Sequence, residues 1–262
     1  MAMFLLEQST NSLCSGMDIE MSLAGDLIRR NKHIHEFKRT WSYEFGVGDP
    51  NDLKGCIPIG TIDFVTDFMR VFKKDFKQNP IEIPAYLRTD EFLKRDYHIG
   101  DIRDVPSSGI WFVKDVSTLK HFSKVCNLNY EFNDLLELGR DANYLVSSVV
   151  DILSEWRVYV LDGEIANICN YNGDCTLFPD MSLVKKAVSL IELNEKWLKS
   201  YTIDVMVTKK GTALIEIHNF TSVGLYSTLW GQNLLWGYID GIRYLQEDNH
   251  KLALKPYKSE VR

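Results

Sequence analysis

The sequence of 262 residues lacks the features that define several classes of protein. No stretch approaches the roughly 20 consecutive apolar residues of a membrane-spanning helix, so we expect no membrane partner. Proline and glycine are modest in number, at 7 and 16 residues, and no repeat or low-complexity segment is present, which excludes a collagen-like fibre and a disordered chain. What is present, 45% hydrophobic and 25% charged residues, is typical of a globular protein of about one to two domains.

Cysteine is also scarce, and its five positions show neither an even count nor the spacing of a metal site. A disulfide-knotted miniprotein is therefore excluded, and reduced thiols in the cytoplasm are the simplest interpretation. Cys169 and Cys175 flank a turn-like NYNGD segment and are the closest pair in the sequence, so they could touch. The first ten residues lack a basic leader, and Glu7 interrupts their apolar run, so we expect no signal peptide.

Positive charge is in deficit, because 30 lysines and arginines face 36 aspartates and glutamates, and the net charge is −6. This balance, without a basic stripe carrying interleaved aromatics, argues against a nucleic-acid-binding protein and excludes a broad polyanion-binding surface. Net charge does not describe a single cleft, so a local basic groove for one phosphate chain is compatible with it.

The first part of the chain predicts a small α/β lobe. Its expected elements are a strand over 4–7, a helix over 17–37, a loop at 46–50, a strand over 56–59 and an amphipathic helix over 62–76. The second strand stops at Gly60-Thr61 and feeds the second helix directly. Helix N-termini bind anions and ligands in α/β folds, although an ordinary strand-to-helix turn explains this pattern equally well.

An irregular stretch between Pro80 and Pro106 separates this lobe, residues 1–106, from a larger strand-rich lobe, residues 107–262. Two hairpins are predicted, one turning at Asp162-Gly163 and one near Lys210-Gly211. The expected elements of the larger lobe are strands over 111–114, 144–150, 156–161, 164–171, 202–208 and 213–217, and helices over 182–199 and 229–245. The chain is thus predicted to be α+β, with antiparallel strands and flanking helices joined to a small α/β lobe.

The second hairpin places two carboxylates, Asp204 and Glu216, on neighbouring strands among apolar residues. Paired strands can direct side chains to a common face, and a carboxylate among apolar residues needs a compensating partner. His218 and Asn219 follow directly and add a nitrogen and an amide oxygen. Carboxylate and amide oxygens suit magnesium, although ordinary polar residues on a solvent-facing strand explain the pattern equally well.

Two further places carry cations that suit a phosphate. Lys114 ends an apolar strand, where it either extends to water at the rim or directs a point charge at a phosphate, and Lys120 and His121 follow. Glu155 and Arg157 share one face of an extended strand. They indicate either a cross-strand ion pair or an arginine that Glu155 holds toward a phosphate or carboxylate.

Taken in order, these segments resemble the ATP-grasp family, and most of all its small phage and bacterial branch named for one arginine and two lysines. GIWFVKDVSTLKHF resembles the branch's phosphate-binding lysine segment, SEWRVYVLDGEIANICNYNGD its Glu-any-Arg hairpin, and YTIDVMVTKKGTALIEIHNFTSVGLY its metal-binding hairpin. CIPIGTIDF resembles the strand of the N-terminal lobe that precedes them. The resemblance spans residues 57–245 and implies a two-lobed ATP-grasp fold whose antiparallel sheets cradle the nucleotide.

The resemblance also implies how the nucleotide would be bound. Lys114, with Lys120 as the second lysine, would bind the phosphates. Arg157, steered by Glu155, would hold a phosphate or the acyl-phosphate intermediate. The adenine would be hydrogen-bonded by the backbone of four consecutive residues, Val146, Ser147, Ser148 and Val149. A mobile phosphate-covering loop is expected over 178–185, with Lys185 and Lys186 as further candidates.

For the metal, the resemblance implies that Asp204 and Glu216 bind magnesium. The third ligand would be Asn219 or His218, because the family usually has asparagine two residues after the glutamate, where this chain has His218.

In activity, the resemblance implies an ATP-dependent carboxylate–amine ligase with ATP and magnesium as cofactors. A carboxylate of a small molecule or peptide would take the γ-phosphoryl group, and an amine would then displace phosphate to form an amide. A nucleic acid enters only as an acceptor substrate. The alternatives are a kinase of the same fold and a non-catalytic or regulatory ATP-binding module.

Overall fold

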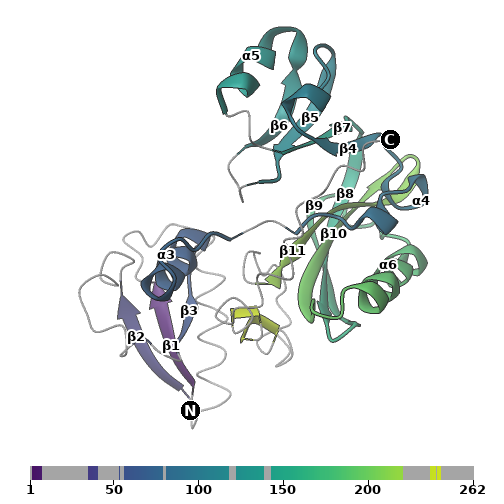
Figure 1. The fold of residues 1–262 in the computed structure, drawn as a ribbon. Coiled ribbons are helices and arrows are strands. Elements are labelled where there is room, and N and C mark those ends of the chain that lie inside the picture. Colours follow the sequence, from purple (N-terminus) through teal and green to yellow (C-terminus); the bar gives the residue numbers. More distant parts are fainter. Residues whose placement is uncertain are drawn as a thin grey trace. The chain divides into compact units, whose positions relative to one another are not determined.

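The computed structural model describes residues 2–7, 35–40, 53, 56–78, 81–117, 122–138, 143–220, 237–239 and 241–242. The chain forms two compact units, whose elements are labelled in Figure 1. Unit 1 combines Met1–Phe76 with Phe220–Arg262, and unit 2 is the continuous segment Lys77–Asn219. Among the described residues, no helix has the length and apolar character needed to cross a membrane.

Unit 1 contains a parallel sheet of order β2-β1-β3, with β1 at Ala2–Glu7, β2 at His35–Thr40 and β3 at Cys56–Ile59. The predicted strands over 4–7 and 56–59 are confirmed. The predicted helix over 17–37 is wrong at its end, because residues 35–37 pair in parallel register with β1. Pairing with a neighbouring strand outweighs the local helical preference there. The rest of that helix and the loop at 46–50 lie outside the described residues.

The helix after β3 is α3, Ile62–Phe72, which confirms the prediction but ends before residue 76. Thr61 caps its N-terminus, because the side-chain oxygen of Thr61 accepts a hydrogen bond from the Phe64 amide at 3.2 Å. Asp63 lies in the first turn, where its negative charge favours the helix dipole. The buried face of α3 consists of Phe64, Val65, Phe68 and Met69.

The last part of the chain contacts the beginning of unit 1. Of the helix predicted over 229–245, residues 237–239 and 241–242 are described, and they are helical and buried. The Tyr238 hydroxyl donates a hydrogen bond to the Pro58 carbonyl in β3 at 2.7 Å. Unit 1 is therefore built from both ends of the chain.

Unit 2 contains two antiparallel sheets of four strands. The upstream sheet has the order β4-β7-β5-β6, with β4 at Tyr97–Gly100, β5 at Ile110–Asp115, β6 at Ser123–Asn127 and β7 at Tyr144–Ser148. Helix α5, Leu128–Leu138, packs on it, since Leu128 and Leu135 share a buried cluster with Val113 and Val146. The strands β5 and β7 are predicted by the sequence, whereas β4, β6 and α5 are not.

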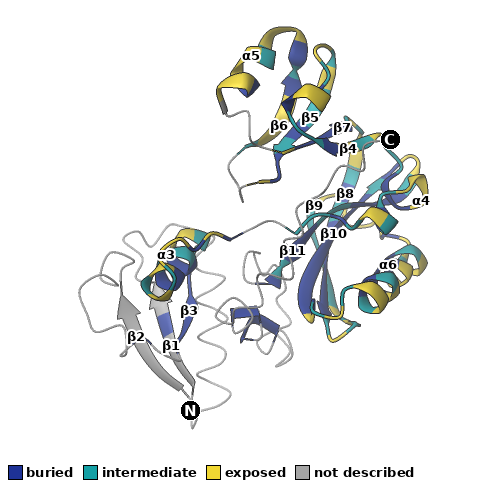
Figure 2. Ribbon diagram, in the orientation of Figure 1, coloured by how far each residue is buried: buried dark blue, intermediate teal, exposed yellow. Residues whose placement is uncertain are grey.

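The downstream sheet has the order β11-β10-β8-β9, with β8 at Ile152–Leu161, β9 at Glu164–Gly173, β10 at Ser200–Thr208 and β11 at Gly211–Asn219. Both predicted hairpins are confirmed. Asp162 and Gly163 have φ values of 46° and 76°, as a type I′ turn requires. The β10 strand is buried along almost its whole length (Figure 2).

Helix α6, Met181–Asn194, covers one face of the downstream sheet. Its buried residues Val184, Ala187, Val188 and Ile191 share one apolar cluster with Ile203 and Val205 of β10. The short helix α4, Asp90–Leu93, adds Phe92 and Leu93 to the same cluster. Because α6 occupies this face, the alternate side chains of β10, including Asp204, point to the other face.

The compact units divide the chain at different places from the predicted lobes. A boundary at residue 106 falls inside unit 2 and would separate β4 from β7, its partner in the upstream sheet. The units instead divide after Phe76 and again before Phe220. The lobes 1–106 and 107–262, as functional divisions, stay a prediction.

Candidate functional site

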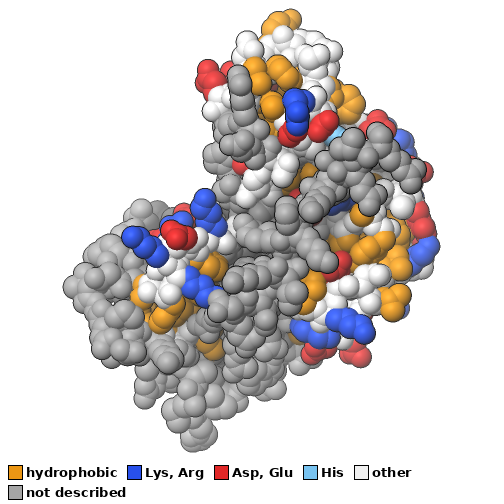
Figure 3. All heavy atoms as spheres, in the orientation of Figure 1, with side chains coloured by type: hydrophobic (Ala, Val, Ile, Leu, Met, Phe, Trp, Pro, Cys, Tyr) orange, Lys and Arg blue, Asp and Glu red, His pale blue; other side chains and the backbone are white. Residues whose placement is uncertain are grey.

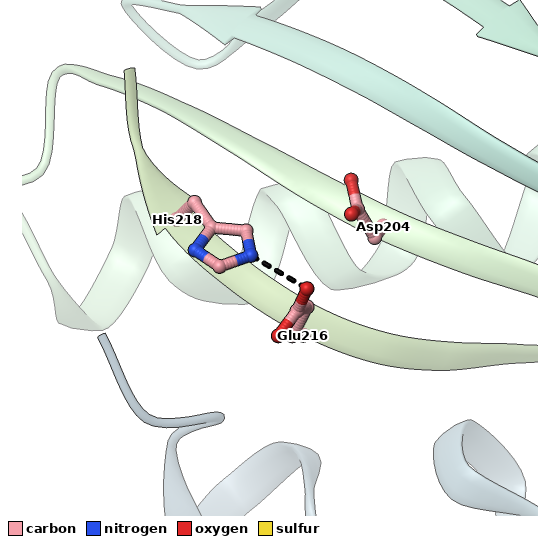
Figure 4. A group of neighbouring side chains, drawn as sticks. All are labelled: Asp204, Glu216 and His218. Atoms are coloured by element: carbon pink, nitrogen blue, oxygen red, sulfur yellow. Dashed lines mark ion pairs between the residues drawn. The ribbon is translucent and has the colours of Figure 1, made fainter. Parts of the chain in front are cut away.

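Three side chains of one hairpin in unit 2 gather in a small space. Asp204 of β10 lies directly opposite Glu216 of β11, and His218 shares the Glu216 face two residues further on. One ligand atom from each lies within 4.8 Å of the others. Figure 4 shows Glu216 between the other two, with the His218 ring directed at its carboxylate.

The opposition of Asp204 and Glu216 depends on an irregularity in β11. From the turn, Thr208 pairs with Gly211 and Val205 with Leu214, so a regular ladder would place Ile215 opposite Asp204. The register shifts between Asp204 and Val205, which makes Ile215 an extra residue, a β-bulge. The Arg95 side chain supports this bulge, because it donates to the carbonyls of Leu214 at 2.7 Å and Ile215 at 3.4 Å.

Asp204 is almost completely buried and forms a two-pronged ion pair with Arg157. Arg157 of β8 lies opposite Asp204 in the ladder, and its Nε and a terminal nitrogen each lie 2.8 Å from one carboxylate oxygen. The side chains of Arg157 and Asp204 are 8% and 1% exposed. This is the cross-strand ion pair that the sequence offered as one interpretation, and such paired geometry is the strongest form of a charged hydrogen bond.

Tyr171 of β9 connects this pair to Glu155. Its hydroxyl lies 2.8 Å from Glu155 Oε2 and 3.4 Å from Asp204 Oδ2, and its ring lies 5.4 Å from the Arg157 guanidinium carbon. Burial raises the pKa of Tyr171, and the Asp204 and Glu155 carboxylates raise it further. Tyr171 therefore acts as a neutral hydrogen-bond donor, and the described contacts link Glu155 to Arg157 through it.

Glu216 is held by two cationic or basic groups. The Nζ of Lys114, from β5 of the upstream sheet, forms an ion pair with Glu216 Oε2, and His218 Nε2 lies 2.6 Å from Glu216 Oε1. Burial alone would raise the pKa of Glu216, but His218 and Lys114 outweigh burial and hold this pKa below its usual range. Glu216 is therefore an anion, and Lys114 joins the two sheets of unit 2.

A cleft of about 230 Å³ opens between these sheets, within unit 2. The upstream sheet contributes Phe112, Lys114, Val116, Ser123, Val125 and Leu145, and the downstream sheet contributes Ile152, Met206, Ile215 and Glu216. The β7–β8 connection contributes Ser147, Ser148, Val149 and Val150, and an earlier segment contributes Ile81, Glu82, Ile83, Arg95 and Tyr97. The cleft thus combines apolar walls with a few charged groups, as small-molecule sites commonly do.

The structure brings most of the sequence-predicted residues to this region. Lys114, Ser147, Ser148, Val149 and Glu216 line the cleft, and Asp204 and His218 adjoin Glu216. The Val146 side chain instead packs in the core beside α5.

Other predicted residues lie elsewhere. Asn219 alternates onto the face of Ile217, which packs in the core, and so does not join Glu216 and His218. Lys186 pairs with Glu91 on the surface of unit 2, and Thr61 caps α3 in unit 1. Lys120 and His121 lie outside the described residues. The four described cysteines, including Cys169 and Cys175, are free thiols.

Arg95, Tyr97, Tyr171 and Met206 were not predicted. Arg95 and Tyr97 lie in the stretch that the sequence presents as irregular, and Tyr171 and Met206 look like ordinary strand residues. Their positions follow from strand pairing between distant segments. Alternation along β10 could have placed Met206 on the Asp204 face, but no local pattern indicates Arg95.

Over the described surface on the face drawn in Figure 3, positive and negative side chains are interspersed. This agrees with the net charge of −6 and leaves positive charge to act locally, as Lys114 and Arg157 do beside the cleft.

The donors at Asp204, Glu216 and His218 fit a divalent cation. Two carboxylates supply the hard oxygen ligands that magnesium prefers, and an imidazole nitrogen is a common ligand for divalent cations of the first transition row. Asp204 retains acceptor capacity because each carboxylate oxygen has more than one lone pair. The close spacing of the three ligand atoms allows one ion to contact all of them.

Comparison with known proteins adds a family match and a fold match. Residues 92–232 match the model of an ATP-grasp domain, family 2 of the clade named for one arginine and two lysines. The matched segment contains Lys114, Arg157, Asp204, Glu216 and His218. No curated protein matches the sequence.

Among solved structures, the fold resembles the D-alanine–D-alanine ligase of Bacillus anthracis complexed with ATP, at 13% identity and a TM-score of 0.51, covering 94% of this chain and 98% of that one. It resembles D-alanyl-alanine synthetase A of Vibrio cholerae at 14% identity and a TM-score of 0.55, covering 94% and 98%. It also resembles the ATP-grasp ligase PsnB complexed with a minimal precursor, at 10% identity and a TM-score of 0.51, covering 93% and 99%. At these identities the likeness concerns the fold.

Proposed function

The chain belongs to the ATP-grasp family, in family 2 of the arginine-and-two-lysines clade, and from this premise we propose that it is an ATP-dependent carboxylate–amine ligase. In this proposal it forms an amide or peptide bond through an acyl phosphate, with ATP and magnesium as cofactors. The observation that carries the proposal is the gathering of Lys114, Glu216 and the Arg157–Asp204 pair beside one cleft of unit 2.

The cleft suits a nucleotide. Its apolar walls, with Phe112 and Leu145 on one sheet and Met206 and Ile215 on the other, offer surfaces for a flat base. We propose that the backbone of residues 146–149 hydrogen-bonds the adenine and that Lys114, with Lys120, binds the phosphates. A lysine supplies a compact positive charge for this purpose.

We assign the metal to Asp204, Glu216 and His218 rather than Asn219, because strand alternation separates Asn219 from the other three. Bound magnesium would neutralise phosphate charge and polarise the transferred phosphoryl group. The protein's own part is to hold the two carboxylates ionised and opposite each other, which the pairs with Arg157 and Lys114 achieve.

The proposed reaction has two steps. A substrate carboxylate oxygen attacks the γ-phosphorus, the bond between this phosphorus and the β–γ bridging oxygen breaks, and ADP leaves. An amine then attacks the acyl carbon, loses a proton, and displaces inorganic phosphate. Such transfer depends on positioning and charge neutralisation, which Lys114 and Arg157 would supply, while Glu155 and Tyr171 orient the Arg157–Asp204 pair.

We propose amino-acid or peptide substrates, consistent with the amino-acid and precursor ligands named for the structural relatives. A nucleic acid would take part only as an acceptor. The free thiols of the described cysteines support the cytoplasmic location predicted from the sequence.

Isotope transfer tests the ligase mechanism. The protein is incubated with magnesium, ATP and pools of amines and of carboxylic acids labelled with ¹⁸O in the carboxylate, and the products are analysed by mass spectrometry. A ligase yields an amide, ADP and phosphate carrying one ¹⁸O from the carboxylate. A phosphoester product would instead identify a kinase.

The control for turnover is Glu216→Ala, which should still fold but lose magnesium-dependent turnover. Nucleotide binding by the wild type without any product across the substrate pools would support the non-catalytic alternative. Unchanged turnover in Glu216→Ala would overturn the metal assignment.

A further inference from the structure

The charged groups assigned to phosphate and those assigned to metal are partners of each other. Arg157 pairs with Asp204 through two contacts of 2.8 Å, and Lys114 pairs with Glu216, which His218 also contacts at 2.6 Å. Each cation expected to meet a phosphate therefore already neutralises a carboxylate expected to meet the metal.

We propose that nucleotide and divalent metal bind this site as mutually dependent ligands, because the Lys114–Glu216 pair must separate to admit either one and only the other can neutralise the partner left behind. This inference rests on the proposed function and adds a thermodynamic property to it.

Consider the nucleotide without metal. Its phosphates would draw Lys114 away from Glu216, which is 30% exposed and only partly compensated by water and His218. The phosphate charge would then lie near two carboxylates, because Asp204 is directly opposite Glu216. Repulsion between like charges in a partly buried site opposes this arrangement.

The metal without nucleotide meets the opposite problem. A divalent cation on Asp204 and Glu216 would stand beside Lys114 and Arg157, both of which would lose part of their compensation. When both ligands bind, phosphate takes the lysine and metal takes the carboxylates, so every charge keeps an opposite partner. A coupling of this kind is reciprocal by thermodynamic necessity.

The Lys114–Glu216 pair, rather than Arg157–Asp204, is the one that exchanges partners. Lys114 and Glu216 both line the cleft, whereas the described lining includes neither Arg157 nor Asp204. The Arg157–Asp204 pair is also more deeply buried, and Tyr171 holds it from a third side. Separating a deeply buried, two-pronged pair is costly.

Calorimetry on the full chain tests the coupling. A non-hydrolysable ATP analogue is titrated with excess magnesium or with a chelator, and we expect the affinity of the wild type to fall at least about tenfold without metal, within the usual range of coupling between ligands. In Glu216→Gln, Lys114 has no charged partner to leave, so we expect the metal-free affinity to rise at least about threefold above the wild type. The effect of magnesium should shrink correspondingly.

The matched control is Glu91→Gln, which also removes one negative charge, but from an exposed pair with Lys186 outside the cleft. Its affinities should equal those of the wild type. Equal gains in both variants would overturn the inference, because they would reflect net charge alone, as would an unchanged or weaker metal-free affinity in Glu216→Gln.

A second measurement needs no variant. Binding of Mn²⁺ to the wild type, followed by electron paramagnetic resonance, should tighten at least about tenfold when the analogue is present. Tight nucleotide binding with no dependence on metal would overturn the inference and leave the proposed nucleotide site intact. Failure of the analogue to bind under every condition would overturn both.

Discussion

At the scale of single residues, Lys114 is the cation whose position links the two sheets of unit 2. Lys114→Ala removes the positive charge proposed to meet the phosphates. We expect affinity for a non-hydrolysable ATP analogue with magnesium to fall at least about tenfold, or ~1.4 kcal/mol, by calorimetry. The control is Lys124→Ala on the neighbouring strand β6, whose lysine pairs with Glu131 at the surface. Equal losses in both variants would contradict a specific role for Lys114.

Glu216 makes stability depend on pH. Its pKa in the folded protein lies below the usual value, because His218 and Lys114 outweigh the effect of burial. In the unfolded chain the carboxylate titrates near its ordinary value of about 4.3, so the unfolded state binds more protons as the pH falls through this range. The stabilisation is present above that pH and is lost below it.

Urea denaturation between about pH 3 and 6 measures this effect. The free energy of unfolding of the wild type should fall more steeply with acidification than that of Glu216→Gln. Parallel slopes for the two proteins would show that Glu216 keeps an ordinary pKa.

Residue types indicated the charged members of the site because a carboxylate or lysine in an apolar strand needs a partner. The identity of the partner was less accessible. The Lys114–Glu216 pair crosses between two sheets, so it depends on how they pack, and no local pattern specifies that. Tyr171 and Arg95 escaped prediction for the same reason, since their contacts come from strands distant in sequence.

At the scale of elements, the β10–β11 hairpin was predictable and its register was not. Alternating runs on both sides of a turn indicate paired strands, and the structure confirms them. Regular pairing, however, puts Ile215 opposite Asp204 and sends Glu216 to the face that α6 covers. The bulge reverses this, and it is supported by Arg95, which lies before β4.

Arg95→Met tests the support of the bulge. The change leaves the carbonyls of Leu214 and Ile215 without this donor, so we expect the free energy of unfolding to fall by about 1–3 kcal/mol. We also expect weaker metal-dependent binding of the ATP analogue, because Glu216 follows the bulge directly. Arg103→Met, which changes a solvent-exposed arginine of the same unit, should leave both quantities unchanged. Wild-type affinity in Arg95→Met would show that the bulge holds its shape without Arg95.

At the scale of the whole molecule, the predicted family and the α+β ATP-grasp fold with antiparallel sheets are confirmed. The contribution of the chain's end to unit 1 was not predicted. Periodicity identifies a helix near residues 229–245, but it carries no information about which distant strand that helix meets. The contact between Tyr238 and Pro58 supplies this information.

Tyr238→Phe measures how much this contact stabilises unit 1. The change leaves the Pro58 carbonyl without its donor at a buried position, so we expect a loss of about 1–2 kcal/mol in the free energy of unfolding. Tyr130→Phe, at a side chain that is 83% exposed, is the control and should change nothing. Equal stability in both variants would mean that Tyr238 contributes through its ring alone.

The bulge at Ile215 also imposes a rule of parity on the sequence. In a hairpin closed by a two-residue turn, residues that face each other directly are separated by an odd number of positions, as Thr208 and Gly211 are. Asp204 and Glu216 are separated by an even number. Any chain that keeps this turn and this even separation can oppose the two carboxylates only if one strand carries an additional residue. A single insertion or deletion between them therefore leaves their chemistry intact in the written sequence while requiring the bulge to be lost, moved or doubled in the folded protein.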